Sequence, residues 1–170
     1  MFLGQEFKIF DWFIIHFTEN NGMAFGLEFG GDTGKIVLSL FRIIVVVWGI
    51  AYVYRLTKKT LPNGALLSLG LVIGGAIGNI IDGVFYGTMF SDSYNRIAEL
   101  FPANGGYEAL LKGRVVDMFY FPLINTHLPE WIPFFANKHF IFFRPVFNLA
   151  DAGISVGMFL LIVFYRKSFS

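Results

Sequence analysis

The chain has 170 residues, of which 55% are hydrophobic and 15% charged, and its formal net charge is +1. This balance, without an interleaved basic and aromatic patch, indicates no nucleic-acid partner. The absence of cysteine excludes disulfides, thiolate metal sites and a cysteine nucleophile. The scattered His16, His127 and His139 lack metal-ligand spacing, and we expect them at a membrane interface rather than in catalysis.

The N-terminal segment, residues 1–34, predicts strands. Phe, Ile and Trp recur at close spacing in residues 6–18, as in a small sheet that lies on a membrane surface. Residues 87–145 share its richness in Trp, Tyr, Phe and Pro. Because such aromatic residues favour the membrane–water interface, we expect both segments to lie there.

Three apolar stretches are long enough to cross a bilayer, at residues 35–54, 65–86 and 146–165. Each measures about 30 Å as a helix. The sequence therefore predicts one membrane-embedded domain over residues 1–170. Its fold class is an all-α polytopic membrane protein with three transmembrane helices and a small extracytoplasmic β/loop subdomain.

Basic residues set the orientation of these spans. The loop between the first two carries three cations and no acid, and two more follow the third span: Arg55, Lys58, Lys59, Arg166 and Lys167. Short basic segments stay in the cytoplasm, so residues 1–34 and 87–145 are expected outside. Residues 1–34 contain no signal peptide or apolar helix to carry them across, so we expect a further helix ahead of Met1.

Two acids lie inside the apolar stretches. Asp82 is four residues from the end of the second, and Asp151 is six residues into the third. A charged side chain there costs from a few to more than about ten kcal/mol, which makes it a candidate functional residue. Antiparallel threading places both acids at similar depth in the outer leaflet.

Each acid follows an asparagine by three residues, on the same helical face. Asn148 with Asp151 also fits a simple helix cap, and a cap is compatible with a catalytic acid. Asn79 with Asp82 lies at the opposite helix end, where the dipole disfavours an anion. Asp82 therefore needs a donor, a cation or a proton. Arg42 is one candidate partner, or it extends to the interface instead.

Two other features accompany these pairs. Gly70, Gly74 and Gly78 recur every four residues and predict a smooth strip for helix packing. Asp117 lies in a loop before an aromatic segment. If that loop reaches the outer leaflet, Asp117 and Asp151 would share a proton and activate water as an acid–base pair.

Four blocks of the sequence resemble the signature blocks of bacterial lipoprotein signal peptidase, or signal peptidase II, in the right order. They are Asn20-Asn-Gly-Met-Ala-Phe25, Gly78-Asn-Ile-Ile-Asp82, Gly113-Arg-Val-Val-Asp117 and Phe147-Asn-Leu-Ala-Asp-Ala-Gly-Ile154. The resemblance implies an aspartic endopeptidase of the bacterial inner membrane that cuts prolipoproteins before a diacylglyceryl-modified cysteine. It implies a monomer with a cleft that is open to membrane lipid. It implies no metal or organic cofactor.

Residue by residue, the resemblance makes Asp117 and Asp151 the catalytic pair. The positions that match its substrate-binding or supporting residues are Asn20, Asn79, Asp82 and Asn148.

Three departures stand out. The family has four spans, and its first is not in this chain. Gly83 replaces the arginine that often follows the Asp82 position, so that charge is either unnecessary or supplied by Arg42, Arg114 or Arg144. The outer segment 87–144 is long, and we expect residues 91–112 to form an added surface helix or flap.

Two other classes of function fit some of these features. A small transporter or proton-relay subunit would use Asp82, Asp151 and Arg42, but the inner halves of the spans are apolar and continue no polar path. A structural membrane anchor would explain the Asn148 cap but not Asp82.

Overall fold

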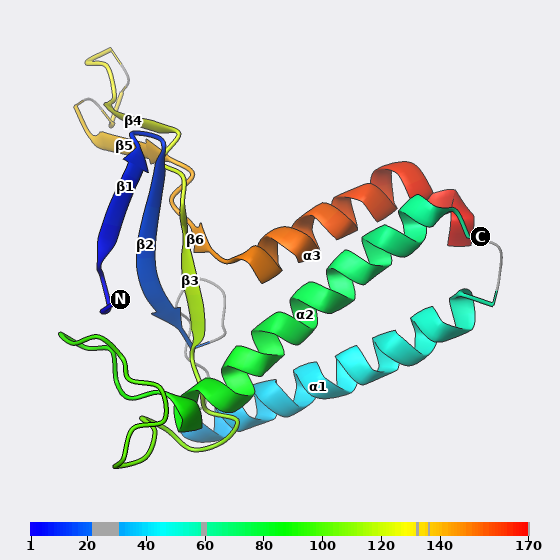
Figure 1. The fold of residues 1–170 in the computed structure, drawn as a ribbon. Coiled ribbons are helices and arrows are strands. Elements are labelled where there is room, and N and C mark those ends of the chain that lie inside the picture. The colour runs from blue at the N-terminus through cyan, green and yellow to red at the C-terminus, as the bar shows by residue number, and fades with distance from the viewer. Residues whose placement is uncertain (22–30, 59–60, 132, 136, 170) are drawn as a thin grey trace.

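The computed structural model describes residues 1–21, 31–58, 61–131, 133–135 and 137–169. Three long apolar helices run side by side (Figure 1). They are α1 (Gly31–Leu56), α2 (Asn63–Met89) and α3 (Leu149–Leu160), the last continued by η2 (Leu161–Tyr165) and η3 (Arg166–Phe169). Each is long enough to cross a bilayer, which confirms the three predicted spans.

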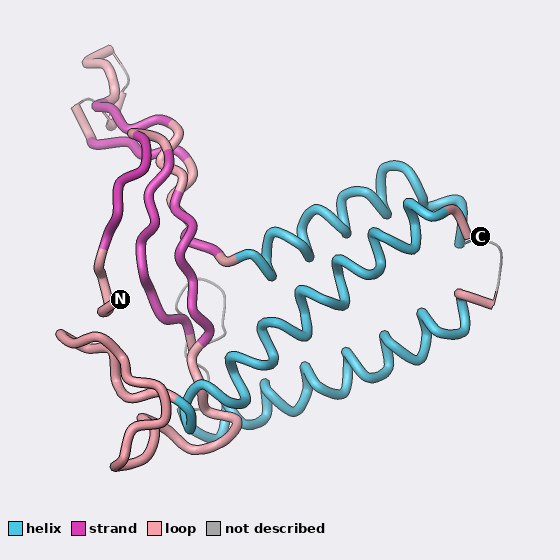
Figure 2. Tube along the Cα trace, viewed as in Figure 1, coloured by secondary structure: helices cyan, strands magenta, loops and turns pink. Residues whose placement is uncertain are grey.

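The strands lie at one end of the helices, where α2 ends and α3 begins (Figure 2). A four-stranded antiparallel sheet has the order β1-β2-β3-β6, and β4 and β5 form a separate two-stranded sheet. The bounds are β1 Glu6–Phe10, β2 Phe13–Asn20, β3 Val115–Tyr120, β4 Ile124–His127, β5 His139–Phe142 and β6 Val146–Phe147. The strands predicted within residues 6–18 are confirmed.

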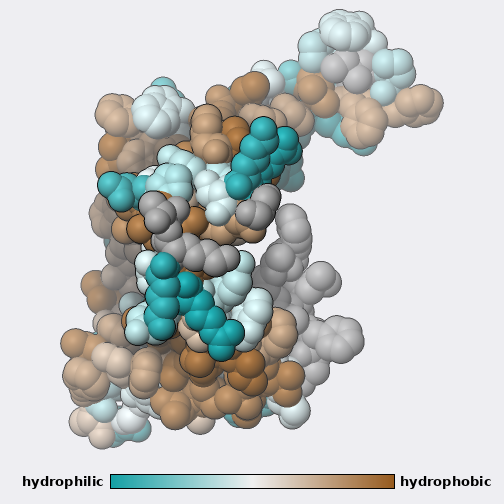
Figure 3. Space-filling model, turned by 90° about the vertical axis from the view of Figure 1, so that its right-hand side faces the viewer, coloured by the Kyte–Doolittle hydropathy of each residue, from teal (hydrophilic) through white to brown (hydrophobic). Residues whose placement is uncertain are grey.

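The opposite end carries the α1–α2 connection and the C-terminus. Figure 3 looks at this end and shows hydrophilic side chains gathered on it, with hydrophobic ones on the flanks. Arg55, Lys58, Arg166 and Lys167 belong to its described segments. Lys59 lies outside the described residues. On the flank of α1, large apolar side chains such as Phe41, Ile44 and Trp48 are exposed, as expected of a surface that faces lipid.

The third predicted span began too early. Val146 and Phe147 form β6, which pairs with β3, and the helix starts only at Leu149. Asn148 causes the change of direction because its backbone is extended (φ −114°, ψ 178°) while its side chain caps the helix that follows.

Of the two forms predicted for residues 91–112, a surface helix or a flap, the helix is absent, and Ser91, Ala98 and Tyr107 of this segment line the cavity described below. The backbone N–H groups of the segment are turned toward carbonyls in the last turns of α2: Phe101 donates to Met89 at 2.7 Å, and Glu108 donates to Gly87 at 2.9 Å. Carbonyls at a helix end have no partner within the helix, so this segment satisfies them as an irregular wrap. A Cβ at Gly87 would lie 2.9 Å from the Glu108 Cβ, so the close approach requires glycine.

The glycine strip that packs α2 against α3 is not the predicted one. A Cβ at Gly75 would lie 2.4 Å from the Ala150 carbonyl oxygen, and one at Gly157 would lie 2.6 Å from the Ser68 carbonyl oxygen. Among the described residues, a Cβ at Gly70 or Gly74 would meet nothing within 4 Å, and of the predicted strip only a Cβ at Gly78 would contact α3. A spacing of four residues drifts around a helix of 3.6 residues per turn, so the strip leaves the contact face.

Candidate active site

Asn148 organises the site. Its side-chain oxygen accepts a hydrogen bond from the Asp151 N–H at 2.9 Å, and an Asp151 carboxylate oxygen accepts one from the Asn148 N–H at 3.5 Å. This reciprocal pair is a capping box, so the predicted cap is present. The amide nitrogen of Asn148 remains available and donates to the Asp117 carboxylate at 2.9 Å. One side chain thus contacts both predicted catalytic acids.

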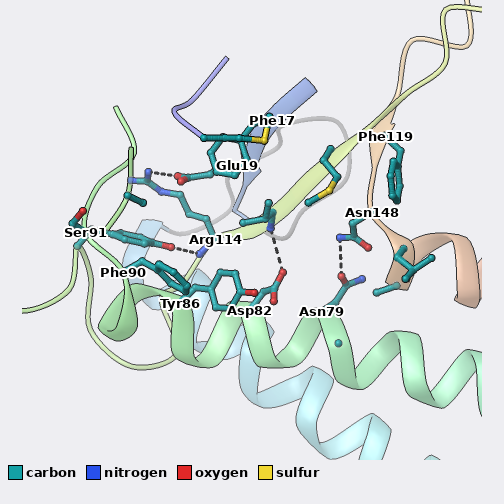
Figure 4. Close-up of a pocket in the computed structure, with 18 residues that line it drawn as sticks. Phe17, Glu19, Asn79, Asp82, Tyr86, Phe90, Ser91, Arg114, Phe119 and Asn148 are labelled. Carbon is teal, nitrogen blue, oxygen red and sulfur yellow. Dashed lines mark hydrogen bonds and ion pairs between the residues drawn. The ribbon is translucent and has the colours of Figure 1, made fainter. Parts of the chain in front are cut away.

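Asn79 completes the connection from α2. It donates to Asp151 Oδ1 at 2.7 Å, and its side-chain oxygen accepts from the Asn148 amide at 3.0 Å. Figure 4 shows Asn79 pointing from α2 toward Asn148. The two acids, 34 positions apart in the sequence, are therefore joined through two asparagines. Amides suit this place because they donate to a carboxylate without adding charge.

Asp117 lies on a strand and not in the loop that the sequence predicted. It is in the middle of β3, opposite Thr18 of β2. Alternation along the strand buries Val115 and Asp117 on one face. The sheet thus turns this carboxylate toward the start of α3.

The environment of Asp117 favours its protonated form. Asp117 is only 4% exposed. Burial, and next the negative charge of Asp151, raise its pKa from 3.8 to about 6, with a smaller contribution from Asp82. Hydrogen bonds from Asn20, at 3.4 Å, and Asn148 act in the opposite direction. Asp117 therefore holds a proton between about pH 4 and 6, where an isolated aspartate is ionised.

Asp82 supports the strand that carries Asp117. One of its carboxylate oxygens accepts a hydrogen bond from the Val116 N–H at 3.3 Å, next to Asp117 in the chain. A backbone donor thus supplies the partner that the end of α2 required. Arg42, the candidate cation, is instead near enough to Asp151 for an electrostatic attraction.

A second polar group was missed by the sequence analysis. Arg114 donates to a Glu19 carboxylate oxygen at 2.7 Å, and the Ser93 hydroxyl donates to the other at 2.6 Å. The Arg114 N–H also donates to the Tyr107 hydroxyl at 2.7 Å. Glu19 directly precedes the first signature block, and Arg114 lies within the third. Because the two residues are 95 positions apart, sequence spacing gives no sign of their contact. Since Glu19 balances Arg114, this arginine is not a free replacement for the charge absent at Gly83.

A cavity of about 570 Å³ lies between the end of α2 and the sheet (Figure 4). Among the described residues, its walls are mainly apolar, with Phe17, Val116 and Met118 on the strands. Asn79, Asp82 and Asn148 form part of its polar lining. Among the described residues that line the cavity, Asn79 and Asn148 contact the two acids, while Asp117 and Asp151 themselves are not part of the lining.

The described residues thus bring together Asn20, Asn79, Asp82, Asp117, Asn148 and Asp151. The end of the first signature block, residues 22–25, lies outside the described residues. Within the described part of the chain, no group of three or more His, Asp or Glu residues could hold a metal ion. Chemically, the arrangement offers one carboxyl group whose protonated form is favoured by burial and a second carboxylate, both oriented by neutral amides. Such a pair can donate a proton to one atom and accept one from another.

Comparison with known proteins gives a consistent result. A family model described as signal peptidase (SPase) II matches residues 1–166. The chain is 52% identical to the lipoprotein signal peptidase of Porphyromonas gingivalis, in an alignment that covers 100% of this chain and 74% of that protein. It is 36% identical to the lipoprotein signal peptidase of Amoebophilus asiaticus, with coverage of 98% and 66%.

A solved structure agrees at the level of the fold. It is described as "Bacterial membrane enzyme structure by the in meso method at 2.3 A resolution" and superposes with a TM-score of 0.55 at 21% identity. The match covers 100% of this chain and 76% of that one. The likeness supports the polytopic membrane fold.

Proposed function

The chain belongs to the signal peptidase II family, and on that premise we propose that it is an aspartic endopeptidase that removes the signal peptide from diacylglyceryl-modified prolipoproteins. The bond cut is the one before the lipidated cysteine, with Asp117 and Asp151 as the catalytic pair. The observation that carries this proposal is the hydrogen-bonded connection Asp117–Asn148–Asn79–Asp151. The family match favours this function over a transporter or a structural anchor.

The two acids differ in environment, and this difference assigns their roles. Asp151 lies in the first turn of α3, where the positive end of the helix dipole stabilises negative charge. Asp117 is buried in the sheet, and its raised pKa of about 6 favours the protonated form. Asp151 is therefore the general base and Asp117 the general acid.

The reaction then balances in two steps. Asp151 accepts a proton from water as the water oxygen bonds to the scissile carbonyl carbon, and Asp117 gives its proton to the carbonyl oxygen. In the second step the C–N bond breaks, Asp151 passes its proton to the cysteine nitrogen, and a hydroxyl proton of the intermediate returns to Asp117. The signal peptide leaves with a new carboxyl group and the lipoprotein with a free amine.

The supporting residues hold this geometry. Asn79 and Asn148 orient the two carboxyl groups, Asp82 positions β3, and Asn20 donates to Asp117. All of them come from one chain, which suits a monomer. The aromatic strands at one end and the basic residues at the other support a place in the inner membrane, with the site near the extracytoplasmic face.

Cleavage of a diacylglyceryl prolipoprotein by the full protein tests the proposal. Asp117→Asn and Asp151→Asn should each abolish cleavage while the protein still accumulates in the membrane. Asp11→Asn is the matched control because its side chain is 92% exposed and contacts only the nearby Lys8 in the described ion pairs; it should keep full activity. The same prolipoprotein without its diacylglyceryl group should remain uncut. Full activity of either site variant would rule out the assigned pair.

A further inference from the structure

The β4–β5 hairpin has one apolar and one polar face. Its register pairs Ile124 with Phe142 and Thr126 with Phe140, and these neighbouring side chains share one face. The other face carries His127, which lies 5.3 Å from the His139 ring, centroid to centroid. His139 also forms a hydrogen bond with the Asn125 side chain at 2.5 Å on that face. Ile141, opposite Asn125, is the apolar residue on this otherwise polar face, so the hairpin is amphipathic across its thickness.

Its tip adds more apolar surface. Trp131 is 80% exposed and Phe134 is 93% exposed, and Phe135 beside them is more than half exposed. The side chains of Ile124 and Phe142 at the base are about half exposed. Large aromatic groups contribute strongly to the free energy of burial, so their clustering in one exposed element indicates a partner that removes them from water.

The hairpin stands apart from the rest of the fold. It does not join the four-stranded sheet, and both views show it projecting sideways beyond the helices (Figures 1 and 3). A two-stranded hairpin alone is marginal in water, which again calls for a partner surface.

The chain limits how far the hairpin can lie from the membrane boundary. Phe142 ends β5, and the membrane-spanning helix α3 begins at Leu149. Seven residues reach at most about 25 Å, even when fully extended. Since it also projects sideways past the described helices, the hairpin would overhang the lipid next to α3.

We propose that the apolar face and tip of the β4–β5 hairpin bind the headgroup–acyl boundary of the bilayer beside α3. Trp and Phe favour that boundary because their rings are apolar and polarisable. The hairpin and its flanks also carry the cations Lys138 and Arg144 against the single acid Glu130, which suits a surface with anionic phospholipids. The Lys138 ammonium lies 5.0 Å from the centre of the Phe135 ring, so cation and aromatic group approach the same surface.

Binding at this depth has a structural consequence. The hairpin is followed at once by β6 and the first turn of α3, which carry Asn148 and Asp151. An anchor here holds the start of α3 at a constant depth relative to the lipid. The proposal depends on the membrane location of the chain and is independent of the reaction assigned to its acids.

Depth-dependent fluorescence quenching tests the anchor. The chain has three tryptophans, so Trp12→Phe with Trp48→Phe leaves Trp131 as the single reporter. The full protein is reconstituted in bilayers of phosphatidylethanolamine and phosphatidylglycerol with bromine atoms near the top or near the end of the acyl chains. Trp131 should be quenched more strongly by the shallow bromines than by the deep ones, and little by iodide in the buffer. A variant that keeps only Trp48, exposed on α1, provides the reference for a residue on the lipid-facing surface of a helix.

Two hairpin variants locate the binding face. Phe140→Ser with Phe142→Ser should reduce the shallow quenching of Trp131 several-fold, whereas Ile141→Ser, on the opposite face, should leave it nearly unchanged. Strong iodide quenching without bromolipid quenching in the parent reporter would show a hairpin in water and overturn the proposal. Protection from both quenchers would show burial against protein, such as a second copy, and would also overturn it. The quenching of Trp131 in the parent reporter tests the proposal without any hairpin variant. A variant that misfolds therefore does not leave the proposal untested.

Discussion

At the residue scale, Asn148 combines two roles that can be separated by substitution. Its side-chain oxygen caps α3 and its amide nitrogen contacts Asp117. Serine can replace the capping oxygen but has no amide to donate from the same position. The cap and the donor therefore predict different effects on stability and activity.

We expect Asn148→Ser to keep the helix cap, since Ser and Asn cap helices almost equally well, but to lose about 1–3 kcal/mol of stability because Asp117 and Asn79 lose a buried donor. Its cleavage rate should fall up to roughly tenfold, because a hydrogen bond contributes about 0.5–1.5 kcal/mol. Asn148→Ala should lose similar activity and about 1 kcal/mol more stability. Thermal unfolding in detergent and the cleavage assay measure the two effects. Parental activity in Asn148→Ser would show that the amide donor is dispensable.

The pKa of Asp117 predicts a pH-dependent stability. The folded carboxyl loses its proton near pH 6 and the unfolded one near pH 3.8, so the folded state binds more protons between these values. The stabilisation is complete below about pH 4 and is lost as the pH rises through about 6, by up to about 3 kcal/mol. Asp117→Asn should escape this loss and become the more stable protein above pH 6. Thermal unfolding of both proteins from pH 4 to 7 tests this, and parallel curves would contradict it.

At the element scale, the close contact of α2 with α3 determines where Asp151 lies. The contact places Gly75 against the carbonyl of Ala150, the residue before Asp151. A side chain on α2 at this point would have to move the first turn of α3, and Asp151 would move with it. Helix packing and site geometry are thus coupled through one glycine.

Adjacent glycines offer a matched pair to test that coupling. Gly75→Ala should destabilise the protein by about 1–3 kcal/mol through overpacking and lower activity even well below its unfolding temperature. In the described part of the chain the added Cβ of Gly74→Ala meets nothing within 4 Å, so this variant should be neutral, or more stable by up to about 1 kcal/mol through helix propensity. Unfolding and cleavage are measured for both. Equal behaviour of the two variants would refute the role of this contact.

At the scale of the whole molecule, the two ends of the helix bundle differ in chemistry. The strands and the candidate site lie at one end, and the basic α1–α2 connection and C-terminus lie at the other (Figure 1). Positive segments remain in the cytoplasm. The proposed orientation therefore directs the site outward.

The cysteine-free chain makes this orientation measurable. Lys58→Cys marks the basic end, and Asn104→Cys marks the exposed segment near the end of α2. In intact spheroplasts an impermeant maleimide should label Asn104→Cys but not Lys58→Cys, and opening the membrane should allow both to react. Labelling of Lys58→Cys alone in intact cells would place the site on the cytoplasmic side.

The sequence by itself determined the three spans, the strands near the N-terminus and the family, because hydropathy, side-chain alternation and signature blocks are local patterns. It also singled out Asp82 and Asp151, since an acid in an apolar run is conspicuous. Local patterns also led to errors, as at residues 91–112, whose backbone donors serve the end of α2 instead of a helix of their own.

Only the tertiary structure decided which groups meet. The sheet turned Asp117 inward, Asn148 and Asn79 joined it to Asp151, and Glu19 balanced Arg114. The register of β2 with β3 and the packing of α2 on α3 determine these contacts. Their physical origin is side-chain alternation in a paired strand and close approach at glycine, which act between segments far apart in the chain.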